Sequence, residues 1–125
     1  MPERVLVIDD DPALVRMIRL ALLSDGLLVD TASDGVQGLE ATELASYDLI
    51  VLDLQMPNMD GRAFFREFRA RGGTTPVVLL SAYGAQDARV ELKAEAAISK
   101  PFDPAVLVRT VRSILPAEAV CETEP

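Results

Sequence analysis

Three short runs of apolar residues dominate the pattern of hydrophobic and polar positions along this chain. They occupy residues 5–8, 49–52 and 77–80, and each is followed by polar residues or a turn signal. A continuous apolar run of this length is typical of a strand buried on both faces, and hence of a central strand in a parallel sheet. The pattern therefore predicts three central strands, the second of which leads directly into Asp53.

Two weaker runs indicate the edges of the same sheet. Leu28, Val29 and Thr31 belong to a half-polar segment, and residues 97–99 form a short one that ends before Lys100. Short or half-polar strands are expected where a strand has a neighbour on one side only. We therefore expect these two strands to flank the three central ones.

Between the predicted strands, apolar residues recur at the spacing typical of amphipathic helices. Helices are predicted to begin near residues 12, 35, 62, 86 and 104. Asp11 before Pro12, and Asp103 before Pro104, have the pattern of an N-cap followed by a proline in the first turn. In the second helix, the residues predicted to face the core are Val36, Leu39, Leu44 and Ala45. In the third helix they are Phe64, Phe65 and Phe68, and in the fourth they are Ala88, Val90 and Leu92.

Strands that alternate with helices predict an α/β fold in which helices cover both faces of a parallel sheet. With strands numbered along the chain, the order 2-1-3-4-5 places the apolar strands in the centre and allows right-handed crossovers. This is the order of a flavodoxin-like (βα)5 three-layer sandwich. We expect one domain over residues 1–115, followed by a flexible tail or the start of a linker over residues 116–125.

The amino-acid composition disfavours or excludes several classes of function for this chain. The formal net charge of the 125 residues is −8, which disfavours direct binding to nucleic-acid phosphates. There is no histidine, so His-based triads, His metal clusters and a phosphodonor histidine are excluded within this chain. No apolar run approaches the roughly 20 residues that span a membrane. The single Cys121 has no disulfide partner, and we expect a cytoplasmic protein that does not bind membranes.

Charged and polar residues stand where the predicted strands end. Asp9 and Asp10 follow the first strand, Asp53 ends the third, Ser81 follows the fourth and Lys100 follows the fifth. In the predicted order these ends lie together at the edge of the sheet where α/β folds bind ligands. Three carboxylates within ~4–6 Å would repel by roughly a few kcal/mol per pair. A lysine and a hard cation such as Mg²⁺ would offset that repulsion. The residues therefore predict a site for Mg²⁺ and a phosphoryl group, with Asp53 as the nucleophile.

The same residues resemble a known family. The acidic pair 9–10, the segment 51–61 around Asp53, Ser81 with its following alanine, and the Lys-Pro-Phe segment 100–102 are similar to the receiver domain of bacterial two-component response regulators. The resemblance covers nearly the whole chain. It implies that a sensor histidine kinase or a histidine phosphotransfer protein phosphorylates Asp53, and that Ser81 and the lysine at the start of 100–102 sense the phosphoryl group.

The resemblance also implies the metal ligands and the role of the chain. Asp10, Asp53 and the main-chain carbonyl of Gln55 would hold Mg²⁺, for which Mn²⁺ would substitute, and Asp9 would act mainly through water. The chain would be a signalling switch rather than an enzyme, catalysing only its own phosphorylation and dephosphorylation. A downstream effector domain or protein would be its partner, and a homodimer is one assembly that this role implies.

The chain departs from the family pattern near the predicted fourth helix. Receivers usually carry Tyr or Phe where Ala97 stands, and a Gly-Ala turn where Lys93 and Ala94 stand. Tyr83 is the candidate substitute for the missing aromatic. Ala97 therefore leaves open an alternative, a protein-binding module that works without phosphorylation. A phosphatase acting on an external substrate is disfavoured, because such enzymes usually carry a second Asp where Gln55 stands.

Overall fold

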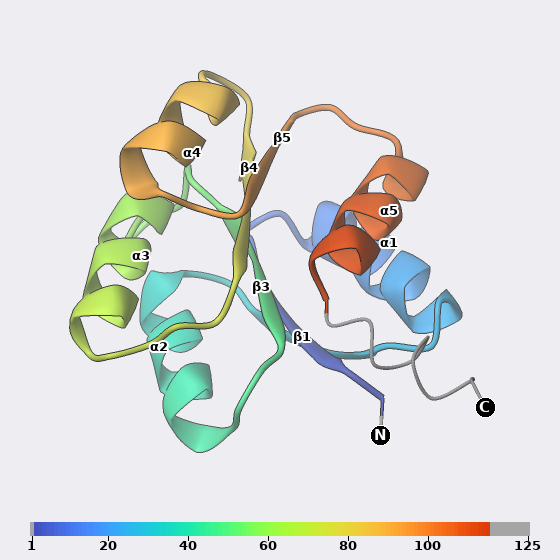
Figure 1. Cartoon of the computed structure of the whole chain (residues 1–125), viewed down its shortest axis with the longest axis horizontal. Coiled ribbons are helices and arrows are strands. Elements are labelled where there is room, and N and C mark those ends of the chain that lie inside the picture. The colour runs from blue at the N-terminus through green and yellow to red at the C-terminus, as the bar shows by residue number, and fades with distance from the viewer. Residues whose placement is uncertain (1, 116–125) are drawn as a thin grey trace.

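The computed structural model describes residues 2–115 of the chain, so the predicted tail and Cys121 lie outside the described residues. Strands and helices alternate along the described part (Figure 1). None of its helices is both long and apolar enough to cross a membrane. In chain order the elements are β1 (Arg4–Ile8), α1 (Pro12–Ser24), β2 (Leu28–Ala32), α2 (Gly35–Leu44), β3 (Leu49–Asp53), α3 (Gly61–Ala70), β4 (Val77–Ser81), α4 (Ala85–Leu92), β5 (Ala96–Ser99) and α5 (Pro104–Ile114).

The strands form one parallel sheet in the order β2-β1-β3-β4-β5. This confirms the predicted α/β, flavodoxin-like architecture. The central strands β3 and β4 are buried along their whole length, whereas most residues of the edge strand β2 are exposed. The strength of each apolar run therefore predicted the place of its strand, because a central strand must be apolar on both faces.

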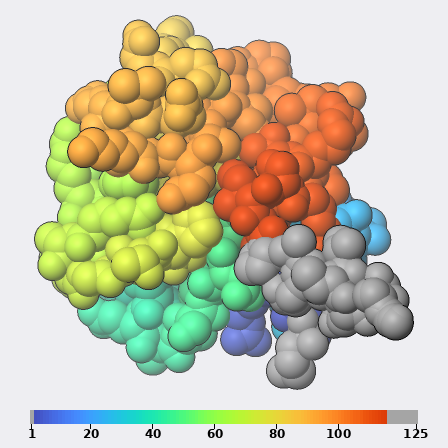
Figure 2. Space-filling view, viewed as in Figure 1, coloured from blue at the N-terminus to red at the C-terminus, as the bar shows by residue number. Residues whose placement is uncertain are grey.

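Two hydrophobic cores lie back to back on the sheet. Figure 1 shows α1 and α5 on one face and α2, α3 and α4 on the other. In the space-filling view, α3 and α4 adjoin on one side of the molecule and α5 lies on the opposite side (Figure 2). Successive strand residues point to opposite faces. Leu6 and Ile8 accordingly pack with the α2–α4 core, and Val5 and Val7 pack with the α1–α5 core. Each central strand is thus held from both sides.

Most helices begin at an aspartate whose carboxylate accepts a hydrogen bond from a main-chain N–H of the first turn. The capping residues are Asp11, Asp34, Asp60 and Asp103. The two predicted caps that precede a proline are therefore confirmed. The exception is α4, which lies between Gly84 and Lys93, both in the left-handed conformation, and has no side-chain cap. The start of α4 consequently depends on packing and main-chain hydrogen bonds.

Part of the predicted core face of α2 was wrong. Val36 is 45% exposed and Leu44 is 87% exposed. Among the buried residues of this helix are Gly38 and Leu39. A Cβ atom on Gly38 would lie 2.6 Å from Cδ1 of Ile8. Because α2 approaches the sheet through a glycine, its apolar residues do not mark the buried face.

The prediction that Val90 of α4 faces the core was also wrong, since its side chain is 66% exposed. Ala88 and Leu92 are buried, as predicted. Residues two positions apart on a helix point about 200° away from each other. Val90 lies between the two buried residues in sequence, so it points to solvent.

Candidate functional site

The ends of four strands bring the predicted site residues to one edge of the sheet. Asp53 ends β3 and Ser81 ends β4, while Asp9 and Lys100 are the first residues after β1 and β5. The register pairs Asp53 with Leu80 and Ser81 with the last residue of β5. The strand order and this register together explain how residues far apart in the sequence meet.

Asp53 lies in a cluster of carboxylates with a single lysine. One carboxylate oxygen from each of Asp9, Asp10 and Asp53 lies within 4.8 Å of the other two. The Lys100 Nζ is 3.1 Å from Asp9 Oδ2 and 3.1 Å from Asp53 Oδ1. The side chains of Asp9 and Asp53 are almost fully buried, whereas Asp10 is exposed. The predicted meeting of these four residues is therefore observed.

These residues stand out because little else that is polar is buried. Within residues 2–115 the buried polar or charged residues are Glu3, Asp9, Asp53 and Ser81. Three of these four belong to the predicted site. Burying a polar or charged group costs free energy unless it is hydrogen-bonded or paired. A cluster of such groups at a sheet edge is the pattern expected of a functional site.

The loop after β3 holds Asp53 in place through a close main-chain contact. The Gly61 N–H donates to the Leu54 carbonyl at 3.1 Å. A Cβ atom on Gly61 would lie only 2.3 Å from the Asp53 carbonyl oxygen. Glycine is thus required here for steric reasons, because the start of α3 packs directly on the main chain of Asp53 and Leu54.

The electrostatic environment of Asp53 disfavours its charged form. Burial and the negative charge of Asp9 raise the pKa of Asp53 from 3.8 to about 6, against the opposing effects of Lys100 and the Gln55 N–H. Burial lowers the pKa of Lys100, but its hydrogen bonds and attraction to Asp9 and Asp53 outweigh that effect, so the pKa is raised. The lysine therefore stays charged at neutral pH and offsets part of the carboxylate repulsion.

The cluster fits a hard divalent cation. Lys100 supplies one positive charge against three carboxylates, so an excess of negative charge remains. All the candidate side-chain ligands are carboxylate oxygens, which Mg²⁺ prefers, and Mg²⁺ usually keeps several waters. The exposed Asp10 gives the cluster a side that is open to solvent. That Asp10, Asp53 and the Gln55 carbonyl bind the metal, with Asp9 acting through water, stays a prediction.

Ser81 is present at the site, but its hydroxyl is bonded to its own loop. Its side chain is fully buried. The Ser81 Oγ–H donates to the Tyr83 carbonyl at 2.6 Å, and the Tyr83 N–H donates back to Oγ at 3.1 Å. Tyr83 is 80% exposed, and that it substitutes for the aromatic where Ala97 stands stays a prediction. That Ser81 contacts a phosphoryl group stays a prediction.

The hydrogen bonds of the Gln55 side chain are a part of the site that was not predicted from the sequence, where Gln55 was considered as a main-chain ligand and as a replacement for the second Asp of a phosphatase. The Gln55 Nε2 donates to Ser81 Oγ at 3.1 Å. The sequence offered no clear signal, because β3 ends at Asp53 and the chain bends at residues 54–55, so strand alternation does not fix the direction of the Gln55 side chain. The long side chain then determines which neighbour it reaches.

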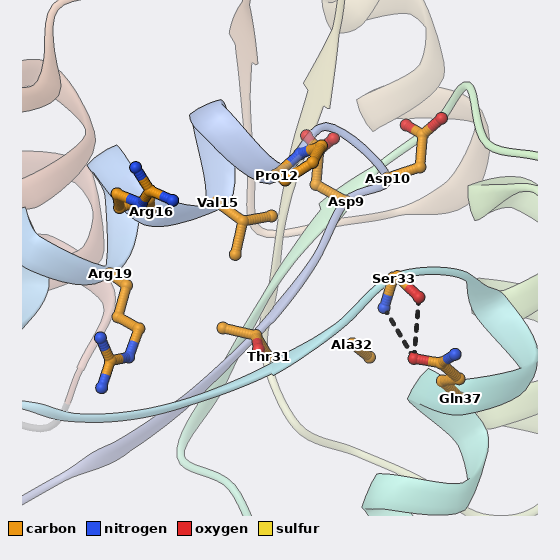
Figure 3. Close-up of a pocket in the computed structure, with 10 residues that line it drawn as sticks. All are labelled: Asp9, Asp10, Pro12, Val15, Arg16, Arg19, Thr31, Ala32, Ser33 and Gln37. Atoms are coloured by element: carbon orange, nitrogen blue, oxygen red, sulfur yellow. Dashed lines mark hydrogen bonds between the residues drawn. The ribbon is translucent and has the colours of Figure 1, made fainter.

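A groove of about 370 Å³ adjoins the acid cluster (Figure 3). Asp10 lies at one end of it. Arg16 and Arg19 of α1 lie on one side, and Ser33 and Gln37 lie on the other. The main-chain N–H and the hydroxyl of Ser33 both donate to the Gln37 carboxamide. The exposed acid thus lies beside a groove whose lining also carries positive charge.

Comparisons with known proteins agree with this site. A family model described as the response regulator receiver domain matches residues 5–112. The chain is 40% identical over 115 residues to the transcriptional activator protein IrlR of Burkholderia pseudomallei, an alignment that covers 90% of this chain and 50% of IrlR. The chain spans about half the length, or less, of the first curated relatives that it matches.

Solved structures with the same fold include bound forms. The chemotaxis protein CheY4 of Vibrio cholerae superposes with a TM-score of 0.85 at 28% identity, over 92% of this chain and 100% of CheY4. The response regulator TrrA of Thermotoga maritima, solved in complex with Mg²⁺-BeF, gives 0.81 at 29% identity, over 90% of this chain and 99% of TrrA. The similarity therefore extends over the strands that carry the acid cluster.

Proposed function

The chain belongs to the response regulator receiver family of two-component systems, and on that basis we propose that Asp53 is its phosphoacceptor. Members of this family interact with histidine kinases and are not enzymes in the usual sense. The observation that carries the assignment is the buried Asp53 carboxylate, which lies beside Asp9 and Asp10 and 3.1 Å from the Lys100 ammonium.

The proposed reaction is a transfer between two side chains. A carboxylate oxygen of Asp53 attacks the phosphorus of a phosphohistidine on a sensor histidine kinase or a histidine phosphotransfer protein. The new O–P bond forms as the P–N bond breaks, and the leaving imidazole nitrogen takes a proton. Bound Mg²⁺, or Mn²⁺ in its place, would supply positive charge to the phosphoryl oxygens. Asp10, Asp53 and the Gln55 carbonyl would hold the ion directly, and Asp9 through water.

Lys100 and Ser81 have separate proposed roles in this reaction. The Lys100 ammonium, already 3.1 Å from Asp53 Oδ1, would pair with the negative phosphoryl oxygens. The Ser81 hydroxyl would turn from its loop and donate a hydrogen bond to one of them. Hydrolysis reverses the switch: water attacks the phosphorus, the bond to the Asp53 oxygen breaks, and inorganic phosphate leaves. Catalysis is thus limited to the chain's own phosphorylation and dephosphorylation.

The consequences of phosphorylation are also part of the proposal. Residues 1–115 would form the receiver domain, and the output would come from an effector domain or protein that responds to its conformation. IrlR, twice the matched length, is named a transcriptional activator. The net charge of −8 supports an output that does not rely on direct nucleic-acid contacts by this domain. We further propose that the chain forms a homodimer. We also propose that it is located in the cytoplasm, and the single Cys121 supports this location.

The alternative of a binding module that works without phosphorylation is not favoured. It was suggested by Ala97 of β5, a departure from the family pattern that does not remove any member of the acid cluster or Lys100. The three carboxylates and the lysine, on which phosphoryl transfer depends, are all in place. A binding module would have no need to keep this repulsive cluster.

Mass spectrometry after incubation with acetyl phosphate tests the phosphoacceptor. We expect the wild-type chain to gain the mass of one phosphoryl group when Mg²⁺ is present, and to gain none after chelation. Asp53→Asn should gain none in either condition. Asp48→Asn, a change of an acid at the opposite end of β3, is the matched control and should behave like the wild type. An unmodified wild-type chain with Mg²⁺ present would refute the proposal.

A further inference from the structure

The Ser81 hydroxyl has no free hydrogen-bonding capacity in this structure. A hydroxyl has one donor and two acceptor positions. Its single proton goes to the Tyr83 carbonyl at 2.6 Å rather than to Gln55 Oε1, which lies farther away at 3.4 Å. Its two acceptor positions are used by the Tyr83 N–H and by Gln55 Nε2. Ser81 is also fully buried, so water does not compete for it. Any new bond from Ser81 must therefore replace one that exists.

Gln55 supplies the part of this arrangement that comes from another segment of the chain. Its Nε2 lies 3.1 Å from Ser81 Oγ, and its Oε1 accepts from the Ala82 N–H at 3.4 Å. The same residue donates its main-chain N–H to Asp53 Oδ1 at 3.3 Å. One residue thus connects the phosphoacceptor, through its main chain, with the β4–α4 loop, through its side chain.

We infer that the Gln55 carboxamide is a positioning residue that holds Ser81 in its resting conformation and so sets how readily Ser81 engages a phosphoryl group on Asp53. The inference rests on the proposed function, because it concerns what opposes the switch. When Ser81 turns toward Asp53, the Gln55 bond to Ser81 Oγ and the bond to the Tyr83 carbonyl are both given up. A chain without the Gln55 carboxamide has one bond fewer to break.

The expected change in the population of the engaged state can be estimated from the net free energy of one hydrogen bond. Loss of a bond that must break during switching should favour the engaged state by about threefold to tenfold. The Gln55 bond to the Ala82 N–H is long, at 3.4 Å, so most of the effect should come from the contact with Ser81. The main-chain carbonyl of Gln55 is unchanged by substitution of its side chain.

Beryllofluoride with Mg²⁺ is the probe for the test, because it mimics an acyl-phosphate without a covalent step. We compare its apparent affinity for the wild type and for Gln55→Met, whose side chain has similar length but no strong donor or acceptor. The expected result is binding about threefold to tenfold tighter for Gln55→Met, with the amide NMR signals of Ala82 and Tyr83 shifted before any probe is added. Unchanged or weaker binding would overturn the inference. Gln55→Asn, whose amide is shorter, is the second variant if Gln55→Met folds poorly.

A double-mutant cycle separates this role from simple access to Asp53. In a Ser81→Ala background the Gln55→Met change should alter beryllofluoride affinity by less than about twofold, since the bond it removes is already absent. The same gain in both backgrounds would mean that Gln55 only obstructs the probe, and would overturn the inference. Mg²⁺ affinity is also measured for each variant without beryllofluoride, so that any change at the metal site is subtracted before the beryllofluoride affinities are compared.

The outcomes also distinguish this inference from the function it rests on. If the wild type binds beryllofluoride and Gln55→Met binds it equally, the inference fails and the phosphoacceptor site stands. If the wild type does not bind beryllofluoride with Mg²⁺ present, the proposed function fails and the inference fails with it.

Discussion

The two ends of the sheet differ in how completely their acidic side chains are paired with basic ones. At the carboxyl end, Asp9, Asp10 and Asp53 lie together, and Lys100 pairs with the first and the last of them. At the other end, Arg112 of α5 forms ion pairs with both Glu3 and Asp25. Glu3 is 8% exposed, so it too is a buried acid. The difference lies in the pairing: the three acids of the carboxyl end exceed what Lys100 pairs, whereas both acids at the other end pair with the guanidinium of Arg112.

The ion pairs of Arg112 stabilise the fold, whereas the acid cluster around Asp53 does not. The hydrogen bond with Asp25 is the main cause that raises the pKa of Arg112, with Glu3 adding to it. Burial and Asp9 raise the pKa of Asp53 to about 6. A raised pKa means that the folded protein favours the protonated form of the group. For arginine the protonated form is the charged one, whereas for aspartate it is the neutral one, so the charged aspartate is disfavoured. The carboxyl end therefore keeps an arrangement that costs stability until a cation binds.

The pH dependence of stability should show the largest effect. The pKa of Asp53 is about 6 in the native state against 3.8 for its ordinary value, so the native state binds this proton more tightly. The stability of metal-free wild type relative to Asp53→Asn should be highest below pH 4 and fall by up to about 3 kcal/mol as the pH rises through 6. Urea unfolding of both chains between pH 4 and pH 7 measures this difference, and a flat difference would contradict the account.

Substituting one glycine at each end of the sheet should distinguish an effect on fold stability from an effect on phosphoryl uptake. A Cβ on Gly61 would meet the Asp53 carbonyl at 2.3 Å, and one on Gly73 would meet the Phe68 ring at 2.4 Å. Each change to alanine should destabilise the fold by about 2 kcal/mol through overpacking. Gly61→Ala should also slow phosphoryl uptake from acetyl phosphate, because it displaces the main chain of Asp53. Gly73→Ala should leave the rate of uptake per folded molecule unchanged, and equal slowing by both would refute the distinction.

Removing a single acid from each end should give the smallest effects, and only one of the two changes should lower stability. Asp25→Asn weakens the ion pair with Arg112 and should lower stability by less than about 1 kcal/mol, since both side chains are more than one-third exposed. Asp10→Asn removes a repelling charge and should leave metal-free stability unchanged or higher, while weakening Mg²⁺ binding. Denaturant midpoints and Mg²⁺ titrations measure both. A loss of stability in Asp10→Asn would mean that this end is balanced after all.

The parts of the fold that were predictable are those in which burial depends on apolar side chains alone. The runs at β1, β3 and β4 placed three central strands, and therefore the edge at which Asp9, Asp53 and Lys100 meet. The prediction failed at α2, because Gly38 rather than Val36 or Leu44 lies against the sheet. A glycine at a close contact leaves no signal in a hydrophobic pattern.

The candidate site was predictable to the level of which residues meet, but not of how each is bonded. Residue types and strand ends predicted the acid cluster and Lys100. The bonds of Ser81 to Tyr83 and Gln55 depend on the conformation of two loops and on the reach of a flexible side chain. Neither leaves a periodic pattern in the sequence, so only the structure reveals them.

The most direct test of the unbalanced carboxyl end is the stability of wild type and Asp53→Asn at pH 7, with and without Mg²⁺. Without the ion, Asp53→Asn should be the more stable chain. At an Mg²⁺ concentration of 100 times the dissociation constant, wild type should gain about 2.7 kcal/mol and Asp53→Asn much less, so that the difference closes or reverses. A wild type that is already the more stable chain without Mg²⁺, and that gains nothing when Mg²⁺ is added, would contradict the account.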